Sequence, residues 1–427
     1  MHFGIATTDI SPPFPTTMAG YGARYDHFDD IHDPLTFTAL ILEERGRRAF
    51  IGSADLITFE NEHVRALREK IAGLLGAPVD NVLLNASHTH GGPEMRAKGG
   101  GGDTSSAGRY QQFLEEQVLT AASAAAADMQ RGSLWYGLGK SGTPMNRRLE
   151  RTGEIVNAPN REGPVDDRAQ LLVLRGADGD MRALGLRLSC HPVATGAQHR
   201  ITADYPGAFR AACRQAFGPG VTPFFLQGAG GDMRPAQVDD GEKWRQLRHD
   251  ELPVIGEALL ADCLRVLGRG ALVPVGPLSL MGHLKVAKVP CVRLHAKRGE
   301  LDRLLEKGDS LERQHAERIK ASLDAGEGPR EEVDVRVHTL WLTKDFAVVG
   351  IQGEVLIGLG ACVEKALAPN RVLLLGYANG CVGYLPDTKE LKRGGYEQTS
   401  YLYSDWSGPF KPGLERVIAA AAKRHCC

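Results

Sequence analysis

Short apolar runs alternate with amphipathic stretches along most of the chain. Residues 82–86, 170–174 and 372–375 have the length and composition of buried strands. Residues 61–75 instead place apolar side chains at helical spacing, and Gly76 follows as a stop signal. Because strands alternate with helices in this way, the sequence predicts an α/β fold with mixed β-sheets covered by helices.

The same patterns assign the rest of the chain. Further strands are expected at 39–42, 49–52, 134–139, 184–189, 223–226, 286–294, 335–342 and 346–351. Further helices are expected at 111–129, 207–217, 244–266, 301–323 and 355–367. The N-terminus and residues 144–148 are expected to be loops, and the glycine-rich tract 98–103 is a candidate mobile lid. No Pro- or Ser-rich linker divides the chain, so one catalytic domain over residues 1–427 is expected.

Composition and charge narrow the class of protein. Of the 427 residues, 51 are Lys or Arg and 52 are Asp or Glu, which leaves a net charge of -1. That balance argues against a nucleic-acid-binding surface as the main function. No run approaches the roughly 18 apolar residues that span a bilayer, and the first residues lack a signal-peptide pattern, so a cytoplasmic protein is expected. The eight cysteines include no CxxC pair, so we expect free thiols and no Cys-rich zinc site.

Several apolar runs end in residues that can bind a metal or a substrate. The residues at these ends are His88 and His90 after 82–84, His191 after 186–190, Gly230, Gly231 and Asp232 after 224–226, Glu354 after 348–352, and Tyr384 after 373–377. Sites in α/β folds form where strands reach their carboxyl ends and loops begin. These strand ends therefore predict one shared site.

Two imidazoles and one carboxylate are a familiar catalytic zinc set, because they leave an open position for a water whose pKa the metal lowers toward about 7. His88, His191 and Glu354 are the candidate ligands. Each residue also has a structural interpretation. A loop histidine commonly hydrogen-bonds backbone, Glu354 suits the start of the helix that follows it, and Tyr384 suits a half-buried aromatic position.

Taken together, the motifs resemble those of the neutral (alkaline, non-lysosomal) ceramidase family across most of the chain. They occur in the family's order: Ala6-Thr-Thr-Asp-Ile-Ser-Pro-Pro13, Gly20-Tyr-Gly22, Asn85-Ala-Ser-His-Thr-His-Gly-Gly-Pro93, Asn146-Arg-Arg148, His191-Pro192, Gln227-Gly-Ala-Gly-Gly-Asp232, Gly353-Glu354, Gly376-Tyr-Ala-Asn-Gly-Cys-Val-Gly-Tyr384 and Tyr396-Glu397. One such motif is weak evidence, but this many in sequence order is a specific signal. The resemblance implies the fold of that family's catalytic domain.

The resemblance also implies a chemistry, that of a zinc amidase which cleaves the N-acyl bond of ceramide. Carried over to this sequence, the family's zinc ligands fall on His88, His191, Glu354 and Tyr384, and its site-lining residues on His90, Arg147 and Tyr396. Tyrosine is an unusual ligand for zinc, and chemistry alone would not select Tyr384.

The chain departs from the family in ways that bear on the substrate. The family's Gly-Asp-x-Ser-Pro loop carries a serine implicated in catalysis, and this chain has Arg234 at that position. Arg234 favours an anionic or strongly polar substrate over a neutral lipid, unless it pairs with Asp232. Cys381 stands where many relatives have a second tyrosine. The chain resembles the shorter bacterial members, which lack the signal peptide and the C-terminal β-sandwich domain of the long ceramidases.

The remaining residues each have a working hypothesis. On a strand His90 would face the same side as His88, where it would bond the substrate carbonyl, pass a proton to the leaving amine, or play a supporting structural role. Arg147 would stabilise the oxyanion or hold a polar substrate group. The Gly230-Gly231 pair would let backbone amides approach the substrate, or form a tight turn, and Asp232 would orient a site histidine.

These expectations add up to a zinc-dependent hydrolase that cleaves the amide bond of a small polar or anionic N-acyl compound with a metal-activated water. The same metal chemistry suits an ester or a lactone, or amide-bond formation in a biosynthetic pathway. A non-catalytic metal-binding protein is the third alternative, and the complete set of His, His, Glu and Tyr argues against it.

Overall fold

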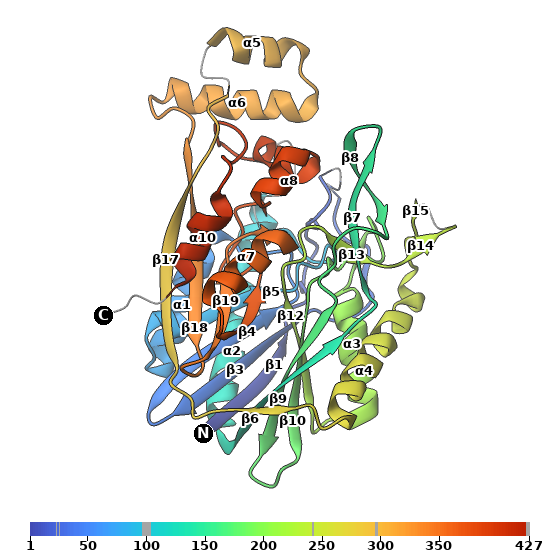
Figure 1. Ribbon diagram of the computed structural model, residues 1–427, viewed down its shortest axis with the longest axis vertical. Coiled ribbons are helices and arrows are strands. Elements are labelled where there is room, and N and C mark those ends of the chain that lie inside the picture. The colour runs from blue at the N-terminus through green and yellow to red at the C-terminus, as the bar shows by residue number, and fades with distance from the viewer. Residues whose placement is uncertain (23, 25, 96–103, 241–242, 295–297, 424–427) are drawn as a thin grey trace.

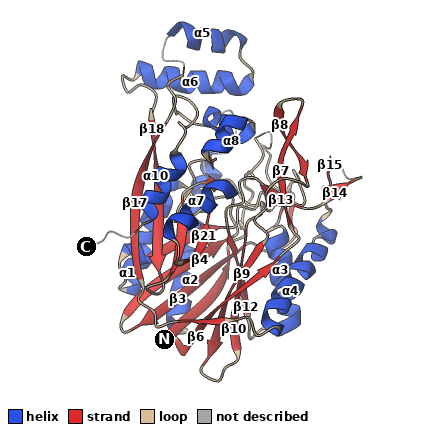
Figure 2. Ribbon diagram, viewed as in Figure 1, coloured by secondary structure: helices blue, strands red, loops and turns tan. Residues whose placement is uncertain are grey.

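Two β-sheets pack face to face at the centre of the computed structural model, which describes residues 1–22, 24, 26–95, 104–240, 243–294 and 298–423 (Figure 1, Figure 2). Buried side chains from both sheets form one apolar cluster between them, including Phe3 and Leu42 from one and Leu340 and Leu373 from the other. Helices cover the outer face of each sheet. This is the predicted α/β fold of mixed sheets covered by helices.

The larger sheet is mixed and has nine strands. They are β1 (His2–Asp9), β3 (Thr36–Glu44), β4 (Arg47–Ala54), β5 (Val82–Ala86), β6 (Gln130–Lys140), β9 (Arg168–Gly176), β10 (Met181–Leu188), β12 (Thr222–Gln227) and β16 (Val273–Val275). Their order is β12-β10-β9-β6-β1-β3-β4-β5, with β16 beside β6. The pairs β4–β5 and β10–β12 are parallel.

The smaller central sheet has the order β17-β18-β19-β21. Its strands are β17 (Met281–Pro290), β18 (Glu332–Trp341), β19 (Phe346–Ile351) and β21 (Arg371–Leu375), and β19 and β21 are parallel. The remaining strands form four smaller sheets. They are β2 (Asp30–Ile31), β7 (Pro144–Arg151), β8 (Glu154–Asn160), β11 (Arg200–Ile201), β13 (Met233–Pro235), β14 (Val238–Asp239), β15 (Lys243–Trp244), β20 (Glu354–Val355) and β22 (Tyr384–Leu385).

The helices fall into groups by the surface that they cover. On the larger sheet lie α1 (Asn61–Leu75), α2 (Thr104–Ala127), α3 (Tyr205–Phe217) and α4 (Pro253–Gly268), and on the smaller sheet α7 (Ile357–Leu367) and α10 (Leu414–Ala422). The remaining helices are α5 (Arg298–Lys307), α6 (Ser310–Asp324), α8 (Thr388–Arg393) and α9 (Tyr396–Thr399), with single 3-10 turns at Val79–Asn81, His249–Glu251 and Ser400–Tyr403. Helices α5 and α6 pack on each other at one end of the long axis (Figure 1).

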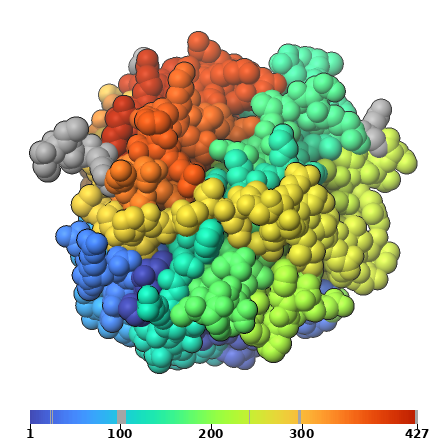
Figure 3. Space-filling view, turned by 60° about the horizontal axis from the view of Figure 1, so that its bottom comes forward, coloured from blue at the N-terminus to red at the C-terminus, as the bar shows by residue number. Residues whose placement is uncertain are grey.

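The connection between the two halves runs over the surface. In Figure 3 the yellow segment that contains β16 and the start of β17 crosses between the orange and red C-terminal part and the blue and green larger sheet. The strand β16 joins the larger sheet through β6, and β17 then opens the smaller sheet. The chain therefore enters its second sheet only after the first is complete.

Most predicted elements are confirmed within a few residues, and the helix at 61–75 matches α1 at both ends. Gly76 ends that helix in the left-handed conformation, with a φ of 60°. The paired strands at 39–42 and 49–52 are confirmed as β3 and β4. The six cysteines in the described residues are free thiols, as expected.

Four expectations about elements are wrong. The N-terminus is not a loop, because His2–Asp9 pairs along its whole length with β3. Residues 144–148 belong to strand β7, whose polar side chains are buried against distant acids. The helix expected from 244 begins at Pro253, a residue that favours the first helical turn. The helix expected at 301–323 is two helices, because Asp309 caps the start of α6.

The candidate lid at 98–103 lies outside the described residues. Among the helices that the structure describes, none has both the length and the apolar character that crossing a bilayer requires.

Candidate metal centre

Three strand ends from the two sheets meet at one point. Asn85, at the end of β5, joins them with its side chain. Its Nδ2 donates to the carbonyl of Gly376 after β21 at 2.7 Å, and its Oδ1 accepts from the amide of Gln227 at the end of β12 at 2.8 Å. The two edge strands of the larger sheet, β5 and β12, are thereby brought together beside the smaller sheet. Ligands that are far apart in the sequence can converge because of this junction.

His88 follows β5 in a constrained backbone conformation. Its φ is 67°, a left-handed value that is uncommon for a residue other than glycine and is found at functional sites. The ring nitrogen Nδ1 lies 2.7 Å from the carbonyl oxygen of Ile57, so Nδ1 carries the proton. The other nitrogen, Nε2, is left as an acceptor and lies 3.2 Å from Oε2 of Glu354.

His191, from another loop, also has its Nδ1 beside a backbone carbonyl and its Nε2 beside Glu354. Its Nδ1 lies 2.5 Å from the carbonyl oxygen of Gly230, and its Nε2 lies 3.2 Å from Oε2 of Glu354. Burial, first of all, and the nearby charge of Arg147 lower the pKa of His191 to about 3. The imidazole is therefore neutral at physiological pH, which is the form that binds a metal.

Glu354 supplies the carboxylate on which both histidines converge. Burial raises its pKa, but the contacts with His88 and His191 outweigh that effect and hold the pKa well below the usual range. The helix that follows is capped at Leu356, and its first amide, that of Ile357, donates to Asp232 at 3.0 Å. Glu354 is therefore free of the capping role that a position before a helix suggests.

His90 also reaches this cluster, although not as a strand residue. Strand β5 ends at Ala86, and the turn at His88 brings the His90 Nε2 to 3.4 Å from the His88 Nε2. Possible ligand atoms of His88, His90 and His191 all lie within 4.8 Å of one another. The His90 Nδ1 is buried without a hydrogen-bond partner among the described residues, so no contact there fixes the position of its proton. Burial, first of all, lowers the pKa of His90.

Two tyrosines pack against the cluster. Tyr384 lies directly beside Glu354 in the short parallel pair β20–β22, and its ring stacks on His191 with the centroids 6.4 Å apart. Burial raises the pKa of the Tyr384 phenol, and Arg147 opposes that shift. Tyr377 stacks on His88 at 4.0 Å, and its hydroxyl lies 3.5 Å from Oε2 of Glu354. In the sequence, Tyr377 is part of the motif that ends at Tyr384, but no role was predicted for it.

Arg147 lies behind Tyr384 in a buried charge network. Its guanidinium carbon is 5.3 Å from the centre of the Tyr384 ring, and its Nε donates to Oε1 of Glu397 at 3.1 Å. Glu397 also pairs with Arg148, which bonds Glu390 at 2.8 Å. In the sequence, Glu397 is part of the Tyr396-Glu397 motif, but no role was predicted for it. The structure shows that it holds Arg147 toward the cluster.

The loop after β12 supports the ligands through its backbone. The Gly231 amide donates to the Val355 carbonyl at 2.9 Å, and the Met233 amide donates to the Gly230 carbonyl at 3.1 Å, which favours the tight-turn alternative for this pair. Within the described residues, no hydrogen bond joins the Asp232 carboxylate to a histidine. The carboxylate accepts from the start of α7, and burial raises its pKa to about 7. The Gly230 carbonyl, which accepts from Nδ1 of His191, takes the orienting role expected of Asp232.

Arg234 and Tyr396 lie at the edge of the centre. No ion pair joins Arg234 to Asp232 within the described residues, and the Arg234 guanidinium lies over the Trp244 ring at 4.9 Å. Tyr396 is 47% exposed, and its ring meets that of Tyr384 edge-on at 5.4 Å. Tyr21, a further residue without an assigned role, contacts the His90 ring at 5.0 Å.

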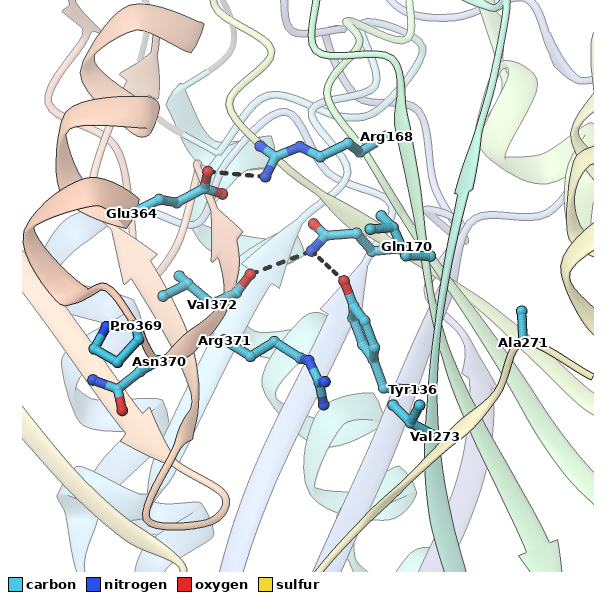
Figure 4. Close-up of a pocket in the computed structure, with 11 residues that line it drawn as sticks. Tyr136, Arg168, Gln170, Ala271, Val273, Glu364, Pro369, Asn370, Arg371 and Val372 are labelled. Atoms are coloured by element: carbon cyan, nitrogen blue, oxygen red, sulfur yellow. Dashed lines mark hydrogen bonds and ion pairs between the residues drawn. The ribbon is translucent and has the colours of Figure 1, made fainter.

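A hollow of about 520 Å³ lies apart from this centre, at the seam between the two sheets (Figure 4). Its polar side chains pair mainly with one another. Arg168 bonds Glu364 at 2.9 Å, and Gln170 donates to the Tyr136 hydroxyl at 3.0 Å. None of the candidate ligands lines it. The convergent donor atoms, and not this hollow, mark the site.

The fold matches solved structures along nearly the whole chain. The crystal structure of neutral ceramidase from Pseudomonas aeruginosa has a TM-score of 0.74 and 20% identity, and the match covers 99% of this chain and 74% of that one. A structure of ceramidase complexed with C2 has a TM-score of 0.73 and 18% identity, with 98% and 73% covered. No protein-family model and no curated protein matches the sequence. At this identity the likeness concerns the fold, and it confirms the neutral-ceramidase-like fold that the ordered motifs predicted.

Proposed function

We propose that this chain, which has the fold of neutral ceramidase, is a zinc-dependent hydrolase that cleaves the amide bond of a small N-acyl compound. Residues 1–427 would act as one catalytic unit. The observation that carries the proposal is the convergence of His88, His191 and Glu354, since the Nε2 atoms of both histidines lie 3.2 Å from the same carboxylate oxygen.

The donor set fits a zinc ion in chemistry and in spacing. Donor atoms held about 2.1 Å from a tetrahedral ion lie about 3.4 Å apart. The contacts of Glu354 with His88 and His191 are both 3.2 Å, which is close to that value. Both Nδ1 atoms are bound to backbone carbonyls, so both Nε2 atoms are aimed at the same point. We assign His88, His191 and Glu354 as ligands, with Tyr384 as the fourth, so that a water molecule would bind as a fifth ligand.

Bound there, zinc supplies a Lewis acid for the amide carbonyl and lowers the pKa of a water molecule toward about 7. The protein's own residues then handle protons and charge. His90 is half-buried with a lowered pKa, and its Nε2 is placed to hand a proton to the leaving amine or to bond the carbonyl oxygen. Its unpartnered Nδ1 suits that role, because either nitrogen can carry the proton.

Arg147 would stabilise the negative charge that develops on the carbonyl oxygen. Glu397 keeps it in place, so little reorganisation is needed during the reaction. Asp232 contributes as a positioning residue by receiving the first amide of α7, and Tyr396 forms part of the entrance. Arg234 adds a positive charge beside this entrance and favours a polar or anionic substrate over ceramide.

Metal analysis combined with an amidase assay tests the proposal. The wild-type protein is expected to hold one zinc per chain after dialysis and to release amine from N-acyl amino acids. His88→Ala and His191→Ala should lose both properties, whereas His2→Ala, which alters an exposed histidine, should keep both. Full activity in the two ligand variants, or a wild-type protein without metal, would refute the proposal. Metal binding without hydrolysis of amides or esters would instead support the non-catalytic alternative.

A further inference from the structure

A second pocket, of about 470 Å³, opens between the β7–β8 hairpin and the segment around β15. Its polar lining consists of Arg151, Asn157, Arg234, Lys243, Trp244 and Gln246. Apolar side chains of β8 complete the wall. We call this set the basic pocket, because it contains three cationic side chains and no acidic one among the described residues that line it.

The cations of the basic pocket form no close ion pair among the described residues, although Glu154 stands opposite Arg151 and Asp239 opposite Lys243 in their strand pairs. Within the described part of the chain, neither Arg151 nor Lys243 forms an ion pair, and both are exposed. Arg234 is more deeply placed. Its Nε is buried without a hydrogen-bond partner in the described residues, and its one polar contact there is a long one, 3.5 Å from Nη2 to the Val193 carbonyl. Three positive charges around one hollow repel one another unless a ligand supplies negative charge.

The wall of the pocket is ordered by contacts other than charge pairs. The Trp244 indole donates to Oδ1 of Asn157 at 2.9 Å, which fixes the indole against the hairpin. Its ring supports the guanidinium of Arg234 at 4.9 Å. The aromatic face thus holds the arginine in place, and its only hydrogen bond to the protein within the described residues is the long one to Val193.

The same segments also hold the metal centre. Met233, next to Arg234, accepts through its carbonyl from the amide of His191 at 3.2 Å. Asp232 accepts from the amide of Arg147, which lies on the strand β7 that forms the hairpin. The basic pocket and the metal centre are therefore built on shared segments, which would bring the pocket within reach of the remote end of a substrate bound at the metal.

We propose that the basic pocket binds an oxyanion, a carboxylate or a phosphate, carried by the substrate at the end remote from the scissile amide. This inference rests on the proposed function and names its substrate class, an N-acyl compound with one anionic group. Guanidinium and ammonium groups bind such oxyanions through charge-assisted hydrogen bonds. The pocket would fix the orientation of the substrate and contribute to KM more than to kcat.

The kinetic test uses matched substrates that end in a carboxylate, a phosphate monoester or a neutral carboxamide. The double variant Arg151→Gln/Lys243→Gln is expected to raise KM about tenfold for the preferred anionic substrate, with kcat changed less than about twofold. The carboxamide should be unaffected, and the comparison of carboxylate with phosphate identifies the oxyanion. Arg245→Gln is the matched control, because it removes a positive charge from the same segment outside the pocket. An unchanged KM, or an equal rise for the carboxamide, would overturn the proposal.

A binding test separates the pocket from the catalytic proposal. Titration of the metal-loaded protein with glutarate and with inorganic phosphate should produce a saturable change in tryptophan fluorescence through Trp244. The change should be absent in Trp244→Phe and shift to at least about tenfold higher concentration in the Arg151→Gln/Lys243→Gln variant. If no amide is hydrolysed but this signal is present, the proposed function fails and the oxyanion site stands. If neither anion gives a saturable signal that depends on these residues, the oxyanion site is refuted.

Discussion

In the candidate metal centre, donor atoms from three loops lie 3.2 to 3.4 Å apart around the carboxylate of Glu354. In the basic pocket a few residues away, Arg151, Arg234 and Lys243 surround a hollow and no acid lies among them. In the first region, acidic and basic side chains lie next to one another, and backbone carbonyls fix the orientation of the histidine rings. In the second region, the three cations form no close ion pair with the described residues. One arrangement suits a small ion with fixed geometry, and the other suits a ligand that brings its own negative charge.

Arg147 and Arg234 show the same contrast in a single residue type. Arg147 is buried and paired with Glu397, so its direction is fixed before any substrate arrives. Arg234 has an aromatic ring beneath it and no acid partner among the described residues. The difference separates a group that stabilises charge developing in a reaction from a group that recognises charge already present.

The largest expected effect on stability comes from removing the buried acid that pairs with Arg147 and Arg148 beside the candidate metal centre. Glu397→Gln removes the carboxylate shared by Arg147 and Arg148 and leaves buried positive charge unpaired. We expect the free energy of unfolding to fall by about 3–5 kcal/mol in urea denaturation. Glu331→Gln, which breaks an exposed pair with Arg293, should cost less than about 1 kcal/mol. Equal losses in the two variants would show that the buried network has no special role.

The next effect concerns the carboxylate of the centre itself. Glu354→Gln keeps the size of the side chain but removes its charge, so zinc affinity is expected to fall by more than about 100-fold, beyond the loss typical of residues that only support a ligand. Competition with a chelator measures that affinity. Glu364→Gln, on the adjacent helix and paired with Arg168, should leave it unchanged. Retention of wild-type affinity in Glu354→Gln would remove this residue from the ligand set.

Arg234→Ser tests the boundary between the two regions. The substitution removes the deepest cation of the basic pocket while leaving His88, His191 and Glu354 in place. We expect KM for an anionic N-acyl substrate to rise about tenfold and zinc content to stay at one per chain. An unchanged preference between acidic and neutral N-acyl substrates would show that Arg234 does not select the substrate.

The smallest expected effect concerns the pH dependence of stability, and it is tested at a buried histidine outside both regions. Burial lowers the pKa of His338 to about 3, and its Nε2 bonds the Asp80 carbonyl at 2.7 Å. Because the unfolded chain titrates near 6.5, it binds more protons than the folded chain between those values, so stability falls as pH drops. From pH 7 to 5.5 this residue accounts for about 1 kcal/mol. His338→Gln should flatten the pH dependence of unfolding by that amount, and His2→Gln should not. Parallel curves for all three proteins would contradict the assignment.

The sequence predicted the candidate site as far as each proposed ligand directly follows an apolar strand. His88, His191 and Glu354 became candidates because a buried run ends just before each of them. Their convergence depends on the junction at Asn85, which joins residues 142 and 291 positions away and leaves no local pattern.

Other features depend on partners that a local pattern does not contain. Residues 144–148 look like a polar loop, but Arg148 is buried because Glu390 and Glu397 from the C-terminal part surround it. The position of His90 follows from the left-handed turn at His88 and not from strand alternation. The basic pocket likewise combines a hairpin with a strand about 90 residues later, as in the contact of Trp244 with Asn157.

The central claim is that His88, His191 and Glu354 hold one metal ion, and anomalous diffraction at the zinc edge tests it most directly. We predict a single strong peak per chain, about 2.0–2.2 Å from the Nε2 atoms of His88 and His191 and from a carboxylate oxygen of Glu354. A crystal that contains zinc but shows no peak at this position, or shows zinc bound by other residues, would contradict the account.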